Sequence, residues 1–475
     1  MRVVILQMLV AGALVAGSLP AEEFTVSPLT DDQSAAMNSI RERDVLATVS
    51  FLASDEMAGR NTPSTELNIA SAYVASRFRA AGLEGLGPEG SFYQTSEIQQ
   101  VMLPNEAATV SRGESSLNVK GLMFAPASAT TVKAAVADGA KPDNVSGKIA
   151  IVEDFVLPPQ AVSNPGMTLT VWARRLSPVT RGGAVAVMIK VADDSLLPEL
   201  IRRVQGKPLT VPPSLIPEIP VVLVSADSDV TGEISITAPG RETLSSRVHN
   251  VIGVLKGRDP EFAKNAVMIT AHLDHIGQLD TDREGDAINN GADDNATGVT
   301  AVVTLADAFS QLEERPRGSL IFMTFWGEEK GLLGSKYYAD QPLWPLDNTI
   351  ANINIEMIGR PEVDAESKAW ASGWTRSTLC EQVAAGAARA GVTVFHREDV
   401  SEMLYSRSDN YSLVQRGVIA HSFSAGSLHS DYHQPSDEVA KLNLPHMTHI
   451  IKGLFAGALP IADGELSPSK SEKTN

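Results

Sequence analysis

The chain has 475 residues, of which 43% are hydrophobic and 20% are charged, so it is long enough for two folded domains and is not expected to be disordered. Its formal net charge of −18 argues against nucleic acid and against anionic membrane surfaces as partners. Cys380 is the only cysteine, which excludes an intramolecular disulfide and leaves the core or bound metal to stabilise the fold.

The first 21 residues have the pattern of a signal peptide. Arg2 supplies a positive charge, residues 3–15 form a short apolar run, and small residues end at Ala21. A membrane-spanning helix needs about 20 apolar residues, so this run is too short. We therefore predict export to the periplasm or the medium, without stable membrane insertion once the signal is removed. A retained membrane anchor is the alternative.

Apolar residues at helical spacing predict an amphipathic helix over residues 64–81, with Thr65 as its cap and Ile69, Tyr73, Val74 and Phe78 on one face. From residue 103 to residue 245 the pattern changes to short β-type runs separated by Pro, Gly and Asp. Examples of these runs are residues 148–152, 184–189 and 220–224. This change predicts a separate β-rich domain, residues 103–245, inserted into the first domain.

From residue 250 onward, predicted strands and helices alternate. The strands are expected at residues 267–270, 319–325, 350–355 and 418–423, and the helices at 298–312, 334–339, 377–390 and 446–459. Such alternation predicts an α/β domain, residues 22–102 and 246–462, with a mostly parallel or mixed sheet and helices on both faces. The tail, residues 463–475, is predicted to be disordered.

Four segments place carboxylates and histidines just after apolar strands, where such sheets bind ligands. They are residues 271–277, 291–298, 327–335 and 429–437. His272 and Asp274 are two residues apart on extended backbone, so Asp274 is placed to accept a hydrogen bond from the ring that binds a metal. Each segment alone also fits an ordinary turn or helix cap. Together they predict a metal centre, because a buried charged cluster without a cation is costly.

In this order and spacing, the four segments resemble the M28 family of co-catalytic zinc peptidases. Residues 146–152 and 181–187 resemble a protease-associated (PA) domain, and residues 51–60 resemble the N-terminal region of PA-containing bacterial members. The resemblance covers nearly the whole chain after the signal peptide. It implies a zinc-peptidase α/β fold with an inserted PA-like domain.

The resemblance implies that the chain binds two Zn²⁺ ions. His272 and Glu356 would bind one ion, Glu329 and His433 the other, and Asp294 would bridge both. It also implies a cis peptide bond after Asp294. Position 356 departs from the family, which usually has Asp there, and the extra methylene of Glu could alter coordination or narrow the pocket.

Three residues are expected to take part in catalysis. The resemblance implies that Glu328 is the general base and that Tyr405 supports the tetrahedral oxyanion, while Asp274 orients His272. Tyr405 also fits an ordinary half-buried tyrosine. Three further histidines, His275, His429 and His421, are not expected to be ligands.

The function implied is that of an exported, two-zinc aminopeptidase acting on oligopeptides. A carboxypeptidase or dipeptidase of the same fold is the first alternative, and it would need a cationic pocket, for which Arg360 and Arg407 are candidates. Glutaminyl cyclisation is a weaker alternative function, because the branch of the fold that catalyses it works with one zinc ion. An inactive receptor-like binding protein is the alternative from a different class.

Overall fold

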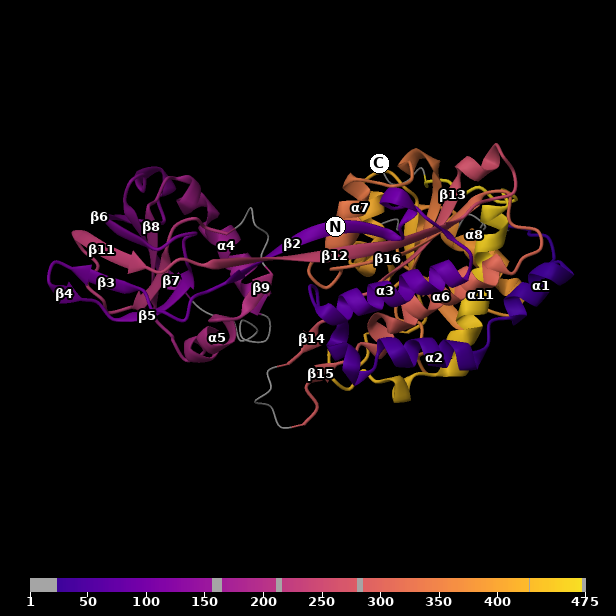
Figure 1. Ribbon diagram of the computed structural model, residues 1–475, viewed down its shortest axis with the longest axis horizontal. Helices are drawn as coiled ribbons and strands as arrows, with labels where there is room; N and C mark the ends of the chain where they lie inside the picture. Colours follow the sequence, from indigo (N-terminus) through magenta and orange to yellow (C-terminus); the bar gives the residue numbers. More distant parts are fainter. Residues whose placement is uncertain (1–23, 156–164, 211–215, 280–284, 427, 472–475) are drawn as a thin grey trace, which may run out of the picture.

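The computed structural model describes residues 24–155, 165–210, 216–279, 285–426 and 428–471. These residues form two domains side by side, and the long strands β2 (Tyr93–Met102) and β12 (Glu242–Leu255) run from one to the other (Figure 1). The predicted signal peptide lies outside the described residues. No helix in the described part of the chain has the length and apolar character to cross a membrane.

The first domain contains most of the helices. They are α1 (Asp31–Asn38), α2 (Glu42–Leu52), α3 (Thr65–Ala80), α6 (Thr297–Ser310), α7 (Leu333–Asp340), α8 (Leu379–Ala387), α9 (Ser401–Leu404), α10 (Asn410–Val414) and α11 (Leu444–Ala462). Its other strands are β1 (Glu84–Gly85), β9 (Pro208–Thr210), β13 (Ala266–His272), β14 (Gly277–Gln278), β15 (Ile288–Asn289), β16 (Ser319–Phe325), β17 (Thr349–Ile355), β18 (Lys368–Ala371), β19 (Thr393–Phe395) and β20 (Ala420–Ser424).

Ten strands form the main sheet, in the order β19-β18-β20-β17-β13-β16-β12-β2-β9, with β1 paired to β12. Its centre, β16, β13, β17 and β20, is parallel, whereas β12 and β2 run antiparallel. The predicted mixed sheet with a parallel centre is confirmed. Because the carboxyl ends of the central strands lie at one edge, the polar segments that follow them meet there.

Helices cover both faces of this sheet. On β16 every residue is buried, with Leu320 and Phe322 in one core and Ile321 and Met323 in another. The first core also contains residues of α2, α3, α6, α8 and α11, and the second contains residues of α7 and α10. Burial on both faces explains why the strand reads as a continuous apolar run.

The predicted helix at residues 64–81 is α3, but its cap and its buried face differ from the prediction. Ser64, not Thr65, caps the helix, since its Oγ accepts a hydrogen bond from the Leu67 amide at 3.0 Å. Val74 and Phe78 of the predicted face are fully buried, whereas Ile69 is 46% exposed and Tyr73 is half-buried. The buried face therefore includes part of the predicted one and extends to Leu67, which is also fully buried.

The second domain has its own sheet and its own core. Its strands are β3 (Thr109–Arg112), β4 (Ser115–Ser116), β5 (Val119–Phe124), β6 (Thr130–Asp138), β7 (Ile149–Phe155), β8 (Ala186–Val191), β10 (Val221–Ser225) and β11 (Glu233–Ala238), with helices α4 (Pro165–Arg181) and α5 (Leu197–Val204). The order is β4-β3-β11-β6-β7-β8-β10-β5. This architecture is consistent with an inserted PA-like domain. Its boundaries at 103 and 245 stay a prediction.

The tail is ordered as far as residue 471. Thr378 donates its amide to the Ser469 carbonyl at 2.9 Å, and Gln382 donates Nε2 to the Ser467 carbonyl at 3.2 Å. Leu466 packs against the first core. The predicted disorder is therefore wrong for residues 464–471, because α8 supplies partners for the backbone, and residues 472–475 lie outside the described residues.

Candidate metal centre

The five ligands implied by the sequence converge at the carboxyl edge of the main sheet. His272 is the last residue of β13, and Asp294 lies in the helical turn Ala292–Ala296 that precedes α6. Glu329 follows β16, Glu356 follows β17, and His433 lies in the loop after β20. Segments far apart in the sequence thus supply one site.

His272, Asp294 and Glu356 form the first cluster. His272 Nε2 is 3.3 Å from Asp294 Oδ1 and 3.3 Å from Glu356 Oε2. The three side chains each offer one ligand atom around a common point.

Neighbouring polar side chains hold the Glu356 carboxylate in place. Asn354 donates Nδ2 to Oε1 at 3.0 Å, and Ser408 donates its hydroxyl to the same oxygen. Asn295 donates Nδ2 to Oε2 at 3.0 Å. The longer side chain at position 356 is therefore fixed with Oε2 toward His272.

A second cluster contains Asp294, Glu329, His433 and also His275. His433 Nε2 is 3.2 Å from Asp294 Oδ2 and 3.3 Å from Glu329 Oε2. His275 Nδ1 is 2.9 Å from Glu329 Oε1 and 3.7 Å from Asp294 Oδ2. His275 was not expected among the ligands, yet its ring lies in this cluster, because β13 ends at His272 and the His275 amide then donates to the Arg60 carbonyl.

The loop that carries Asp294 is held by Asp437. The Asp437 carboxylate accepts hydrogen bonds from the amides of Asp293 and Asp294, both at 3.1 Å. Burial, together with the nearby charge of Asp293, raises the pKa of Asp437 to about 6. The peptide bond between Asp294 and Asn295 is cis, as the family resemblance implies.

The donor set fits zinc. Asp294 Oδ2 and Glu329 Oε1 are buried and accept no hydrogen bond from the described residues. Unpaired carboxylate oxygens in a protein interior are costly, and a cation removes that cost. Imidazole nitrogens with carboxylate oxygens are the zinc ligands of many peptidases. Because Asp294 turns Oδ1 to one cluster and Oδ2 to the other, the geometry suits two ions that share it.

Comparison with known families now identifies this domain. Residues 250–457, which contain both clusters, match the profile of peptidase family M28.

Similarity to individual proteins extends over different parts of the chain. Over 118 residues it is 32% identical to a probable zinc metalloprotease of Pyrenophora teres f. teres, covering 25% of this chain and 24% of that one. Over 180 residues it is 26% identical to aminopeptidase YwaD of Bacillus subtilis, covering 37% of this chain and 35% of that one. The aligned part thus spans only 24–35% of the length of these curated relatives.

Among solved structures, the aminopeptidase from Aneurinibacillus sp. strain AM-1 is similar over 90% of this chain and 96% of its own, with a TM-score of 0.56 and 20% identity. At that identity the likeness concerns the fold, and it extends over both domains.

In the M28 domain, Asp274 contacts Glu328 rather than the ring of His272. Its carboxylate accepts from the Glu328 amide at 3.0 Å and from the Thr62 hydroxyl at 2.9 Å. His272 Nδ1 instead faces the main-chain oxygen of Asp274 at 3.0 Å, while the carboxylate is 3.9 Å away. Burial raises the pKa of Glu328 well above its usual value.

Tyr405 is not brought to the metal centre. The Tyr405 ring packs on the ring of His421, with a centroid distance of 5.4 Å, and the Arg376 guanidinium lies over its face. Tyr405 is not among the residues that line the pocket beside the clusters. Tyr432 lies there instead, stacked on the ring of His433 at a centroid distance of 3.9 Å. Sequence reasoning missed Tyr432, although its position directly before a ligand is the signal that could have found it.

A pocket of about 280 Å³ opens beside the first cluster. His272, Asp294, Glu328 and Glu356 form its polar end. Arg397 and Arg407 also line the pocket, and its apolar lining residues are Met357, Trp370, Val400, Met403, Leu404 and Leu428. The pocket therefore presents an apolar wall next to a cluster of carboxylates.

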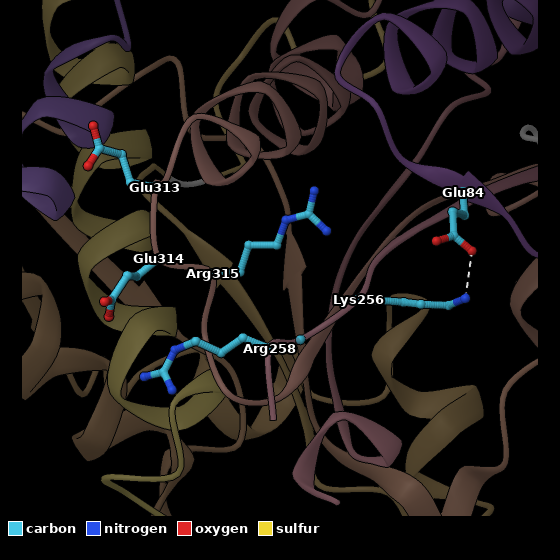
Figure 2. Close-up of a pocket in the computed structure, with 7 residues that line it drawn as sticks. Glu84, Lys256, Arg258, Glu313, Glu314 and Arg315 are labelled. Atoms are coloured by element: carbon cyan, nitrogen blue, oxygen red, sulfur yellow. Dashed lines mark ion pairs between the residues drawn. The ribbon is translucent and has the colours of Figure 1, made fainter. Parts of the chain in front are cut away.

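A larger surface hollow, of about 530 Å³, lies elsewhere (Figure 2). It is lined by charged side chains, among them Lys256 and Glu84, which pair at 2.7 Å. Lys256 directly follows β12, whose last residue, Leu255, pairs with Leu320 near the start of β16. The hollow therefore lies at the edge of the sheet where the parallel strands begin. Neither metal cluster reaches it.

Proposed function

We propose that this chain is an exported, zinc-dependent aminopeptidase that removes N-terminal residues from oligopeptides. One observation carries the proposal: two clusters that share Asp294 adjoin a pocket lined by Glu328. The relatives named as a zinc metalloprotease and as aminopeptidases support it. Export rests on the signal-peptide pattern of residues 1–21.

The residues of the two clusters would hold two zinc ions, with Asp294 between them. When bound, the ions polarise the scissile carbonyl and lower the pKa of a water molecule.

Glu328 accepts the proton of the attacking water and returns it to the leaving amine. It is suited to this work because it lines the pocket and because its raised pKa lets it keep a proton. Its amide is fixed by Asp274, which holds the turn that aims the side chain. Tyr432 lines the same pocket, where its hydroxyl is available to support the oxyanion.

Cleavage from the amino end follows from the charges in the pocket. Asp294, Glu328 and Glu356 place negative charge beside the reacting carbonyl, which favours a free α-ammonium group there. The apolar wall accepts the side chain of the first residue.

A second candidate, a carboxypeptidase or dipeptidase, is favoured by one residue. Arg407 lines the pocket, and its guanidinium has no ion-pair or hydrogen-bond partner among the described residues. Arg360 does not provide such a site, because it pairs with Asp431 at 2.6 Å and contacts His429 at 3.1 Å.

The test is to digest an oligopeptide whose two ends are both free and to read the products by mass spectrometry over time. We expect residues to be lost one by one from the amino end, with activity removed by a zinc chelator and restored by zinc. Loss from the carboxyl end, blocked by amidation of the peptide, would establish the second candidate instead. A zinc-loaded protein that cleaves nothing would favour the binding-protein alternative.

A further inference from the structure

The two clusters differ in how many protein ligands they offer. The first has three, whereas the second has four, because His275 joins it. We propose, relying on the proposed function only for the presence of two zinc ions, that His275 is a direct ligand of the second ion. The second ion is then closed by protein, and the open coordination positions belong to the ion at His272.

The spacing of the four side chains in the second cluster matches a single tetrahedral ion, with Glu329 turning Oε1 to His275 and Oε2 to His433. A zinc ion with bonds of about 2.0–2.1 Å has ligand atoms about 3.3 Å apart. The contacts between neighbouring atoms here are 2.9, 3.2, 3.3 and 3.7 Å, and His275 takes part in the first and the last. His275 therefore occupies a corner of the same tetrahedron as Glu329 and His433.

The second cluster also gathers polar atoms that lack other partners. His275 Nδ1, Asp294 Oδ2, Glu329 Oε1 and His433 Nε2 are all buried and make no hydrogen bond with the described residues. A buried polar atom that is left unpaired destabilises the fold. A hydrogen bond from His275 to Glu329 would pair only two of them, whereas one cation bound by all four side chains pairs every one.

The loop beside His275 is shaped to admit its ring. A Cβ added to Gly291 would lie 2.5 Å from Cγ and 2.6 Å from Cδ2 of His275, so only glycine leaves room. Gly291 also has φ +58, which favours glycine for a second reason. The ring of His275 is fully buried and meets His433 edge-on at 5.5 Å.

The two clusters differ in their relation to the pocket. His272 and Glu356 line it, whereas His275, Glu329 and His433 do not, although the His433 side chain is 33% exposed. Glu356 has Oε1 occupied by Asn354 and Ser408, so it offers the single oxygen Oε2. Zinc sites with four protein ligands are typically structural, and those with three keep a position for water or substrate. His272 and Glu356 would therefore hold the ion that is open to substrate, and His275, Glu329 and His433 would hold the ion that fixes Asp294.

The direct test is X-ray absorption spectroscopy of the protein loaded with two zinc ions, which counts imidazole ligands. If His275 is a ligand, we expect three imidazoles per two zinc ions in the native protein and two in His275→Gln. Two imidazoles in the native protein would overturn the proposal, and this arm does not depend on the folding of any variant.

A competing chelator gives a second readout that is independent of peptide cleavage. His275→Gln should release one of the two ions at least about 100-fold more readily, since even partners that only contact a ligand change affinity by 10- to 100-fold. The other ion should be unaffected. The matched control is His249→Gln, because His249 lies on β12 and contacts Thr95, away from both clusters. Equal retention of both ions in His275→Gln would contradict the proposal, whether or not the enzyme cleaves peptides.

Discussion

Glu328 lines the pocket beside three metal-ligand residues, yet it belongs to neither cluster. Its amide donates to Asp274, and among the described residues its side chain forms no hydrogen bond or ion pair with a metal-ligand residue that would compete with a water molecule. This separation of roles is what a general base requires, because a base must be free to exchange a proton.

Glu328→Gln should lower turnover by about 100- to 10,000-fold while leaving two zinc ions bound, because the amide keeps the shape and loses the basic oxygen. Rates with a free-amine peptide and zinc content by atomic spectroscopy measure the two effects. The control is Glu313→Gln, in the charged hollow of Figure 2, which should behave as the native protein. Undiminished turnover in Glu328→Gln would remove this residue from catalysis.

His421 gives a prediction about stability and pH. Its Nδ1 lies 2.7 Å from the Ser372 carbonyl and its Nε2 2.7 Å from the Ser377 hydroxyl, so the buried ring is neutral. Burial lowers its pKa from 6.5 to about 4. The unfolded chain therefore binds a proton at His421 more readily than the folded protein does. The neutral ring contributes about 3 kcal/mol to the free energy of unfolding above pH 6.5, and this contribution is lost as the pH falls toward 4.

Denaturant unfolding of the metal-free protein between pH 7 and pH 4 checks this prediction. His421→Gln keeps a donor and an acceptor without a titrating group, so its stability should fall less over that range. If the two proteins lose stability in parallel, His421 does not contribute to the pH dependence.

Some site residues could be predicted from the sequence and others could not, for reasons that lie in the backbone. His272, Asp294 and Glu329 occur in segments whose order and spacing are characteristic. His275 was not expected to be a ligand, because the family resemblance does not extend to that position; on an extended strand a residue three beyond His272 would also face the other side. The strand ends at His272, so that spacing rule no longer applies.

At the scale of elements, the turn Asp55–Arg60 connects the N-terminal helices to the metal loops. Arg60 is 1% exposed and donates to the carbonyls of Leu273 at 2.9 Å, Asn290 at 2.8 Å and Gly291 at 3.1 Å. Burial lowers its pKa to about 10, so it remains protonated at neutral pH. One buried guanidinium thus joins the end of β13 to the loop that precedes α6.

Arg60→Met should destabilise the protein by about 3–5 kcal/mol, because it leaves several buried carbonyls without a donor. It should also weaken zinc binding, since both metal loops lose their common support. Urea unfolding measures the free energy of unfolding of Arg60→Met. Arg43→Met is the control, because Arg43 is exposed, and it should change this free energy by less than about 0.5 kcal/mol. Equal stabilities of the two variants would show that Arg60 is dispensable.

The four central strands of the main sheet, β13, β16, β17 and β20, were predicted to within a few residues, because burial leaves a continuous apolar run. Residues 319–325 coincide with β16, and residues 350–355 fall within β17. Helix ends were less accurate, as with the predicted start at Ser377. Ser377 bonds to His421 instead, and α8 begins at Leu379, a contact across the fold that no local pattern reveals.

At the scale of the whole molecule, each domain has a core of its own. One core is built from residues of the main sheet and its helices, and another lies between Val101 and Ala238. Both metal clusters lie in the first domain. Bound metal should therefore stabilise one domain and not the other.

Calorimetry with and without a chelator tests that independence. A zinc concentration about 1,000-fold above Kd stabilises by about 4 kcal/mol, which corresponds to a rise in Tm of roughly 10 °C for a domain of this size. We expect two transitions, of which only one moves down when zinc is removed. A single transition, or an equal shift of both, would show that the domains unfold together.

The central claim is that the metal centre acts on peptides with a free amino end. The most direct measurement compares the zinc-loaded protein on one oligopeptide and on its N-acetylated twin. We predict that acetylation lowers the rate of cleavage at least about 100-fold, because it removes the positive charge of the α-ammonium group that the carboxylates of the pocket bind. Cleavage of both peptides at similar rates would contradict the account.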